Sequence, residues 1–284
     1  MLDFEFKNRY GLDDLLKIMK ILRSENGCPW DKVQTHESIR TDLIEECYEV
    51  CEGIDKNSPE ILKEELGDLL MQVVFHAEIE SERGSFDFGD VCNDICQKLI
   101  YRHPHVFGEG EKKIKADTED EVLKNWDALK KASKQQETYT ETLESVPKTF
   151  PALLRGEKVC KRAARAGIPI NNAEDCIENI QAALGDLGRR ISQQKRDKGE
   201  LSEDFAQNQH ILGEILLRFC NLNRILKNDG EKALTYSTNR FIMAFRAVEN
   251  DIIKQGGSLD KLSDVELSRA VERIGQYINK TDDR

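Results

Sequence analysis

The amino-acid sequence predicts an all-α fold built from two tandem helical domains. Apolar residues recur at helical spacing along most of the chain, whereas no segment shows the alternation that is typical of a strand. The 284 residues exceed the roughly 100–200 residues of a single domain. Only six prolines, with 33% charged and 39% hydrophobic residues, are typical of a helix-rich globular protein. We therefore expect domains at residues 1–136 and 151–284, joined by a linker at 137–150 that contains Pro147.

Glycine and proline residues divide both halves into separate helices. In the first half, Gly27 interrupts the pattern after one helix, Gly84 ends another and Pro104 follows the fourth. Thr35 and Ser58 are suited to cap helices, because a hydroxyl oxygen can accept a hydrogen bond from a free backbone N–H group. The helices predicted in the two halves cover residues 12–23, 35–55, 59–82, 86–102 and 119–136, then 153–166, 173–196, 202–226, 232–251 and 263–278.

The charge balance and the cysteines limit the classes of partner and compartment. The 42 basic and 53 acidic residues give a formal charge of −11, which argues against extended nucleic-acid binding but allows a small anionic substrate bridged by cations. No apolar run approaches the ~20 residues of a membrane span, and no signal segment opens the chain. Eight cysteines without a CxxC pair are typical of a reducing compartment. We therefore expect a cytoplasmic protein with no membrane contact.

Two pairs of carboxylates in the first half are the strongest candidates for chemistry. Glu46 and Glu49 lie in the helix predicted at 35–55, and Glu65 and Asp68 lie in the next one. Residues three apart share one face of a helix, and a single pair of this kind is most often a solvated acidic surface. Here apolar residues occupy most of the circumference of both helices, which favours burial. The short break between the helices predicts an antiparallel hairpin, in which the two pairs could face each other.

Four carboxylates in such an arrangement would repel one another unless they were protonated or bridged by cations. Oxygen ligands at this spacing suit Mg²⁺ or Mn²⁺. Inward-facing carboxylates on neighbouring helices also build metal sites in other helical bundles. From the residues alone, a metal site and a solvated acidic surface are about equally favoured.

The sequence resembles the MazG family of all-α nucleoside triphosphate pyrophosphohydrolases over most of residues 12–170. An acidic element alone would be weak support, but several flanking motifs occur with it in the same order, which makes the resemblance specific. The motifs are Gly27-Cys28-Pro29-Trp30-Asp31, Glu45-Glu46-Cys47-Tyr48-Glu49, Glu64-Glu65-Leu66-Gly67-Asp68, Arg102-His103-Pro104-His105-Val106-Phe107-Gly108, Pro151-Ala152-Leu153-Leu154-Arg155 and Lys161-Arg162-Ala163-Ala164-Arg165.

The resemblance implies hydrolysis of a nucleoside triphosphate between its α and β phosphates, giving a monophosphate and pyrophosphate. Such an activity fits house-cleaning of the nucleotide pool. Glu46, Glu49, Glu65 and Asp68 would then hold Mg²⁺, for which Mn²⁺ could substitute. Those ions would neutralise the triphosphate and acidify a bound water. Glu45 is the first candidate to position or deprotonate that water, and Glu49 is the alternative.

Basic and aromatic residues of the resembling segment are candidates for substrate binding. Lys98 and Arg102 match phosphate-contacting positions, where fixed cations stabilise phosphate charge in the transition state. Trp126 and Lys130 match a W-x-x-x-K element near the family's site, although a packing role explains Trp126 equally well. Trp30 could approach the base or sugar, or simply pack at the helix entry. The resemblance also implies a homodimer, with each site completed near the subunit interface.

The second half resembles a weak repeat of the first that lacks most of the acidic residues. Leu212-Gly213-Glu214 echoes Leu66-Gly67-Asp68, but His210 and Ile211 stand where glutamates are expected, and Ala244 stands in place of Arg102. This departs from the family's pattern, in which the second domain can be catalytic. We therefore expect catalysis in the first domain, with the second supporting dimer packing or regulation.

Two other functions remain open from the sequence. One is a pyrophosphatase of narrow specificity, for example for dUTP or dCTP, because no residue can be assigned to recognition of the base. The other is a non-catalytic helical module for dimerisation or regulation, which the intact acidic pairs of the first half argue against. A triphosphate panel tests the first alternative, and pyrophosphate release with and without Mg²⁺ tests the second.

Overall fold

The computed structural model describes residues 4–108 and 137–280, except 199–204, together with a few isolated positions between 110 and 129. The chain divides into two compact units, residues 1–130 and 131–284. Every regular element in the described ranges is helical, and no strand occurs there, which confirms the predicted all-α class. Lys130 and most of the helix expected at 119–136 lie outside the described residues.

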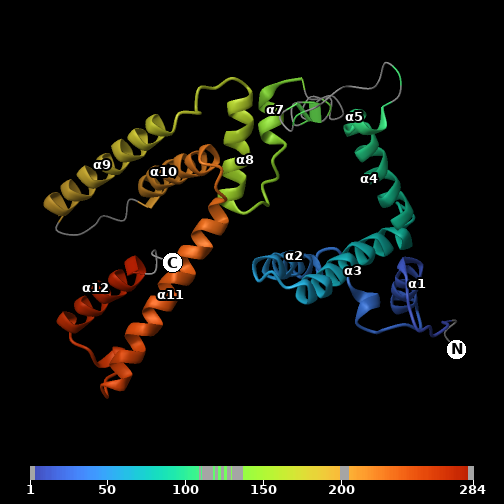
Figure 1. Ribbon diagram of the computed structural model, residues 1–284, viewed down its shortest axis with the longest axis horizontal. Helices are drawn as coiled ribbons and strands as arrows, with labels where there is room; N and C mark the ends of the chain where they lie inside the picture. Colours follow the sequence, from blue (N-terminus) through green and yellow to red (C-terminus); the bar gives the residue numbers. More distant parts are fainter. Residues whose placement is uncertain are drawn as a thin grey trace. The chain divides into compact units, whose positions relative to one another are not determined.

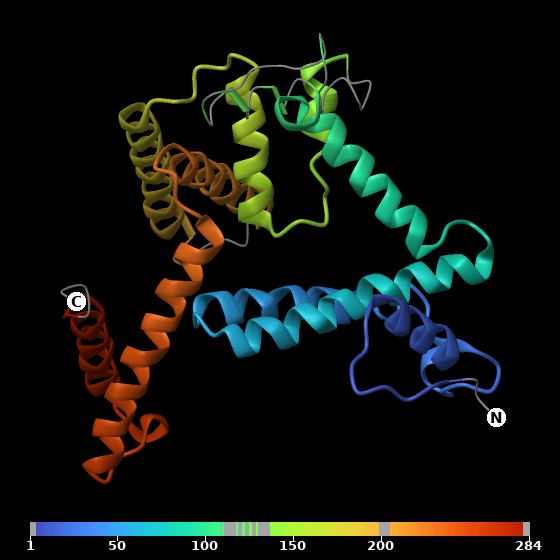
Figure 2. The same cartoon turned by 45° about the vertical axis from the view of Figure 1, so that its right-hand side comes forward.

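The first unit is organised around a hairpin of two helices, α2 and α3, which lie side by side (Figures 1 and 2). Its helices are α1 (Leu12–Arg23), α2 (Arg40–Asp55), α3 (Pro59–Arg83), α4 (Phe88–Arg102) and α5 (Pro104–Phe107), with the 3-10 turn η1 (Asp31–Val33). The Ser58 hydroxyl accepts a hydrogen bond from the Ile61 N–H at 3.3 Å, which confirms the predicted cap of α3. Gly84 ends α3 at φ 72°, in the left-handed region that favours glycine.

The expected start of the second helix at residue 35 is wrong, because α2 begins only at Arg40. Thr35 and Ser38 form a local turn instead: the Thr35 N–H donates to the Ser38 hydroxyl at 2.9 Å, and the Ser38 N–H donates to the Thr35 hydroxyl at 3.3 Å. Side-chain hydroxyls that bond nearby backbone groups compete in this way with helix formation.

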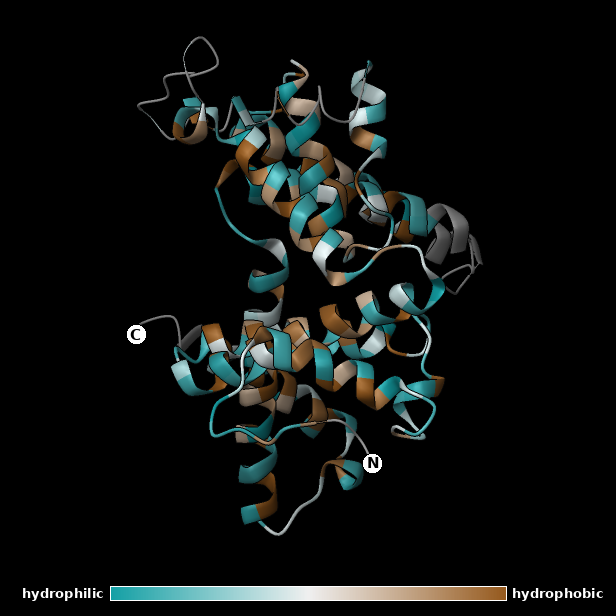
Figure 3. Cartoon of the chain, turned by 90° about the vertical axis from the view of Figure 1, so that its right-hand side faces the viewer, coloured by the Kyte–Doolittle hydropathy of each residue, from teal (hydrophilic) through white to brown (hydrophobic). Residues whose placement is uncertain are grey.

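The core of the first unit lies between α1, the segment before α2, and the C-terminal half of α3. Its buried residues are Met19, Ile39, Val74, Phe75 and Ile79. The part of the hairpin outside this core is less buried, because the side chains of Ile44, Leu66, Leu70 and Val73 are 37–48% exposed. The expectation that α3 is buried all round is therefore wrong, within one chain, for the part of α3 that precedes Val74. Figure 3 shows hydrophobic and hydrophilic residues mixed along the helical ribbons.

Arg23 is a buried cation that ties α1 to α3. It continues the apolar stripe of α1 and is only 9% exposed. Its guanidinium donates to both carboxylate oxygens of Glu82, at 2.7 and 2.8 Å, and to the Asp31 carbonyl at 2.6 Å. The same group lies 5.1 Å from the centre of the Phe75 ring. Arg23 therefore fixes the segment that leads from α1 towards η1.

Replacing Arg23 with alanine should lower the free energy of unfolding by about 2–3 kcal/mol, because several charge-assisted hydrogen bonds are lost at a buried position. Urea denaturation at pH 7 measures this loss. Arg83→Ala is the matched control: Arg83 pairs with Glu80 from an exposed position, and such pairs contribute under ~1 kcal/mol. Equal losses in the two variants would contradict the role assigned to Arg23.

The second unit contains two groups of packed helices. Its elements are α7 (Tyr139–Glu144), α8 (Ala152–Arg165), α9 (Ala173–Lys198), α10 (Phe205–Ile225), α11 (Gly230–Lys254), η3 (Leu259–Lys261) and α12 (Asp264–Lys280). α10 packs against α8 and α9, and α11 packs against α12. The buried residues Val248 and Ile274 lie in the contact between α11 and α12.

The segment expected as a linker at 137–150 contains helix α7 and packs against α8. Val146 is 1% exposed, and the Arg162 guanidinium donates to the Ser145 hydroxyl at 2.7 Å. The burial of Val146 therefore makes this segment part of the second unit. The eight cysteines all lie in the described ranges and are free. No helix in those ranges is both long and apolar enough to cross a membrane.

Candidate active site

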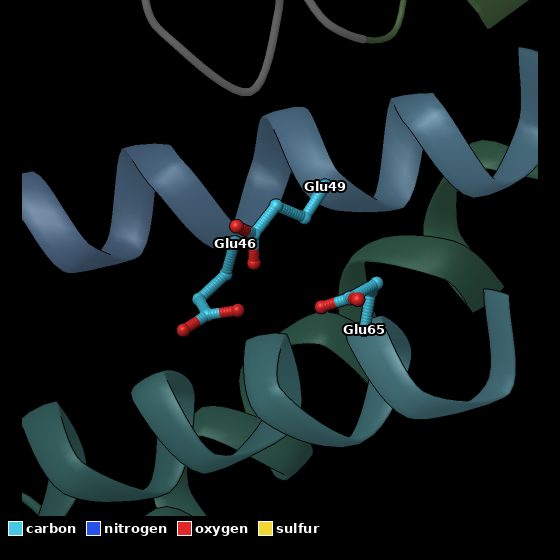
Figure 4. Close-up of side chains that lie close together, drawn as sticks. All are labelled: Glu46, Glu49 and Glu65. Carbon is cyan, nitrogen blue, oxygen red and sulfur yellow. The ribbon is translucent and has the colours of Figure 1, made fainter. Parts of the chain in front are cut away.

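Three glutamates from the α2–α3 hairpin converge on one point. Glu46 and Glu49 project from α2 and Glu65 from α3, towards one another (Figure 4). Each offers an oxygen that lies within 4.8 Å of the other two. Gly53 allows the two helices to approach closely, because a Cβ atom there would lie 2.9 Å from the Leu62 backbone nitrogen. The hairpin itself therefore brings the carboxylates together.

The charged forms of Glu46 and Glu65 are destabilised at this point. Burial, followed by the charges of Asp68, Glu49 and Glu65, raises the pKa of Glu46. Burial and the charge of Glu49 likewise raise the pKa of Glu65. The Glu46 Oε2 atom is buried and has no hydrogen-bond partner within the part of the chain that the structure describes. A buried acceptor without a partner, surrounded by other oxygen ligands, is what a hard divalent cation would satisfy.

Asp68 and Glu45, the two other acidic residues of the predicted site, lie outside this group of three. Asp68 is half-buried on α3, and its charge acts more strongly on the pKa of Glu46 than the charges of Glu49 and Glu65 do. Glu45 is exposed on α2. The geometry therefore places Asp68 in the electrostatic field of the glutamates, and Glu45 outside the group of converging oxygens.

The predicted substrate-binding residues Arg102 and Trp126 lie together at the end of α4. The Arg102 guanidinium lies 5.4 Å from the Trp126 ring centre, and the His103 ring meets Trp126 edge-on at 4.9 Å. Arg102 Nε is buried and lacks a hydrogen-bond partner in the described ranges. Lys98 is exposed one turn earlier on the same helix. Stacking on tryptophan therefore holds this arginine in a fixed position.

The basic residues and the glutamates do not form one site within the described part of the first unit. α4 packs against α3 through Phe88, at its N-terminal end, and Arg102 follows 14 residues later. At ~1.5 Å per residue Arg102 lies about 21 Å along the helix from that contact, and Figures 1 and 2 show α4 leading away from the hairpin. Trp30 is 57% exposed, and its carbonyl accepts a hydrogen bond from the Gln34 side chain at 2.9 Å.

A chain of hydrogen bonds that the sequence analysis missed lies beside the hairpin. His36 Nδ1 lies 2.7 Å from His76 Nδ1, and His36 Nε2 lies 2.6 Å from Glu80 Oε1. Hydrogen bonds to the Glu80 carboxylate, first that from His36 and then those from Ser85 and Arg83, lower the pKa of Glu80 to about 2. Both histidines line an apolar cavity of about 400 Å³ together with Leu43, one turn before Glu46. In the sequence, the only sign of these hydrogen bonds is the spacing of His76 and Glu80, which are four residues apart on α3.

The stability of the protein should fall between pH 7.5 and 5.5 because of His76. Burial, and then the charge of His36, lower the pKa of His76 below its usual 6.5. The unfolded state therefore binds a proton more readily, so the stabilisation is present above pH 6.5 and is lost as the pH falls below it. Urea denaturation across this range measures the effect, and His76→Gln should flatten it. An unchanged slope in that variant would assign the effect to other groups.

Comparison with known proteins agrees with this geometry. The MazG nucleotide pyrophosphohydrolase domain model matches residues 34–107, which include the three glutamates. The Thermotoga maritima protein named nucleoside triphosphate pyrophosphohydrolase/pyrophosphatase MazG is 37% identical over 268 residues, 94% of each chain. The Escherichia coli K12 nucleoside triphosphate pyrophosphohydrolase is 36% identical over 246 residues, 86% of this chain and 89% of that one. Bacillus subtilis YabN is 37% identical over 87% of this chain and 48% of its own. With such identity over nearly its whole length, the chain belongs to the MazG family of nucleotide pyrophosphohydrolases.

Proposed function

We propose that this MazG-family protein hydrolyses nucleoside triphosphates at the acidic group of the α2–α3 hairpin. Membership in the family makes it a nucleoside triphosphate pyrophosphohydrolase, which releases a nucleoside monophosphate and pyrophosphate. The convergence of Glu46, Glu49 and Glu65, with one buried oxygen that lacks a partner in the described ranges, is the observation that carries the assignment of the site. House-cleaning of the nucleotide pool in the cytoplasm is the role that we propose for it.

Mg²⁺ is the cofactor that we propose, with Mn²⁺ as a substitute. Glu46, Glu49 and Glu65 would hold it, and Asp68 would join them from the same hairpin. When bound, the divalent cation would neutralise phosphate charge and acidify water in the site. The donor set fits this cofactor because it consists entirely of carboxylate oxygens.

Proton transfer from the attacking water is assigned to a glutamate of α2. Both Glu45 and Glu49 are exposed, but Glu49 lies among the converging oxygens, whereas Glu45, our first candidate from the sequence, lies outside that group. The position of Glu49 therefore favours it as the acceptor if Glu65, Asp68 and Glu46 suffice to hold the cation. A near-normal rate of hydrolysis in Glu45→Gln would support Glu49 as the proton acceptor. A rate in Glu45→Gln as low as that in Glu49→Gln would favour Glu45 instead.

Lys98 and Arg102 would bind the triphosphate, with Trp126 holding the Arg102 guanidinium by stacking. Lys130 and Trp30 remain proposed contacts of the same substrate.

Because α4 carries Lys98 and Arg102 away from the glutamates within one chain, we propose that a second copy completes the site. The exposed Leu66 and Leu70 on the hairpin would form part of that homodimer contact. Light scattering should report a dimer, and Leu70→Lys should reduce both its mass and the activity.

Hydrolysis in H₂¹⁸O tests the activity directly. Each canonical dNTP, with dUTP and selected modified triphosphates, is incubated with and without Mg²⁺, and the products are identified by mass spectrometry. The proposal requires equimolar monophosphate and pyrophosphate, formed only with the metal. Activity on dUTP or dCTP alone would show the narrow-specificity alternative. No release at any Mg²⁺ or Mn²⁺ concentration would favour the non-catalytic module.

A further inference from the structure

The second unit contains a cavity of about 590 Å³ that carries a net positive charge. It lies between α8, the C-terminal end of α10 and the turn that leads into α11. Five cationic side chains line it: Lys158, Lys161, Arg165, Arg224 and Lys227. Two carboxylates, those of Glu157 and Asp229, also line it, so the net formal charge is five minus two, or +3. This is unusual within a chain of net charge −11.

Three of the five cations form one row on α8. Lys158, Lys161 and Arg165 are spaced three and four residues apart, so that they share one face of the helix. Cys160, on another side of the same helix, is buried. The packing of α8 against α10 therefore fixes the row at the cavity wall.

Both carboxylates of the cavity bind the start of α11. Glu157 Oε1 accepts a hydrogen bond from the Gly230 N–H at 2.8 Å, and Asp229 Oδ1 accepts one from the Lys232 N–H at 3.0 Å. A carboxylate at a helix N-terminus interacts with the partial positive charge there. The two acids therefore serve the helix end as well as the cavity, which leaves the cationic character of the wall in place.

Lys227 occupies a backbone position that favours glycine. Its φ is 58°, and the turn is closed by a hydrogen bond from the Asn228 N–H to the Asn223 carbonyl at 2.9 Å. The turn after α3 in the first unit has the same form, with a bond from Ser85 to Glu80 at 3.1 Å, but Gly84 stands at φ 72°. A side chain at such an angle is strained. A lysine at this position, in the wall of a cationic cavity, indicates a role for its ammonium group.

We propose that this cavity binds a linear polyphosphate group, carried by a nucleoside polyphosphate or by inorganic triphosphate. Its volume lies within the roughly 300–1,000 Å³ that is typical of ligand sites. A row of cations on one helix, faced by Lys227, matches several phosphates in sequence better than a single anion. The cavity does not include Glu214, the remaining acidic residue of the echoed metal motif. We infer a regulatory ligand site that is separate from the glutamates of the first unit.

Calorimetry of the full chain with tripolyphosphate in EDTA at low salt tests the proposal. Without divalent cations the acidic group of the first unit repels phosphate, and the part of the binding that depends on Lys227 and Lys158 reports the second unit independently of the proposed catalysis. We expect one tripolyphosphate per chain. Lys227→Gly should weaken binding at least tenfold without lowering the melting temperature, because glycine suits the positive φ. Lys158→Ala should also weaken binding.

Arg155→Ala is the matched control, because Arg155 is an exposed cation of α8 that does not line the cavity. It should change the dissociation constant by less than twofold. ATP binding more tightly than tripolyphosphate would identify a nucleoside polyphosphate as the ligand, whereas equal affinity would identify the polyphosphate chain itself. The proposal is overturned if tripolyphosphate does not bind, or if Arg155→Ala weakens binding as much as Lys227→Gly.

Discussion

Glu49→Ala should reduce the rate of pyrophosphate release by roughly 10³-fold, since the cation held there supplies several kcal/mol of charge stabilisation and ~1.4 kcal/mol is a factor of ten. Glu49 contributes to the converging group from α2, and its charge helps to raise the pKa of Glu65. Removing the Glu49 carboxylate takes away one ligand of the cation and the proposed acceptor of the water's proton, while Glu46, Glu65 and Asp68 remain. A coupled pyrophosphate assay with a dNTP and Mg²⁺ measures the loss.

Glu214→Ala is the matched control in the second unit. Glu214 is exposed, and among the described residues its carboxylate pairs with His210 at 3.3 Å and with Arg218 at 3.4 Å. The rate should stay within about twofold of the wild-type value, because one exposed carboxylate binds divalent cations poorly. A large loss in Glu214→Ala with a small loss in Glu49→Ala would move catalysis to the second unit.

Mg²⁺ should raise the melting temperature of the protein by several degrees, and chelation should abolish activity. Without a cation, burial and mutual repulsion act against the charged forms of Glu46 and Glu65, as their raised pKa values indicate. Binding of Mg²⁺ to the folded state alone removes that repulsion and stabilises the fold. Differential scanning fluorimetry with EDTA, Ca²⁺, Mn²⁺ and Mg²⁺ measures the shift.

Glu46→Gln separates repulsion from metal binding. Without metal this variant should melt at a higher temperature than the wild type, because a neutral amide replaces a buried charge. In the same variant, the rise in melting temperature on addition of Mg²⁺ should be lost. Glu52→Gln on the same helix is the control, since Glu52 is exposed and pairs with Lys56. A wild-type Mg²⁺ response in Glu46→Gln would show that the cation binds elsewhere.

Helix positions in both units follow from the sequence because the signals for them are local. Ser58 begins α3 through a hydrogen bond of its side chain and Gly84 ends α3 through its backbone preference, and both predictions are confirmed. Thr35 misled the prediction because its side chain has two competing partners, a helix N-terminus and a local turn with Ser38. Helix α7 was missed because it has only 6 residues, too few to show a helical period. It is followed by Val146, which is buried in the second unit.

Helical periodicity predicted the acidic pairs from the residues alone, and the resemblance implied that these pairs hold a metal ion. The spacing of Glu46, Glu49 and Glu65 predicts which carboxylates share a face, and their convergence then depends on the hairpin. The exposure of Leu66 depends on what covers the helix, which periodicity does not reveal. The ion pair of Arg23 with Glu82 joins residues 59 positions apart, so that no local pattern predicts it. The roles of the individual site residues stay predictions.

Gly53 has a consequence for ion selectivity. Because Gly53 has no side chain, α2 can approach the start of α3 closely. The separation of the two helices in turn affects the distances between the glutamate oxygens. The spacing of the oxygens is thus a property of two backbones rather than of flexible loops. Ca²⁺ prefers ligands at about 2.3–2.6 Å and Mg²⁺ at about 2.0–2.1 Å. Because moving the oxygens of the two helices apart by a shift of the backbones would also separate the helices at Gly53, we expect the hairpin to favour small cations before any substrate arrives.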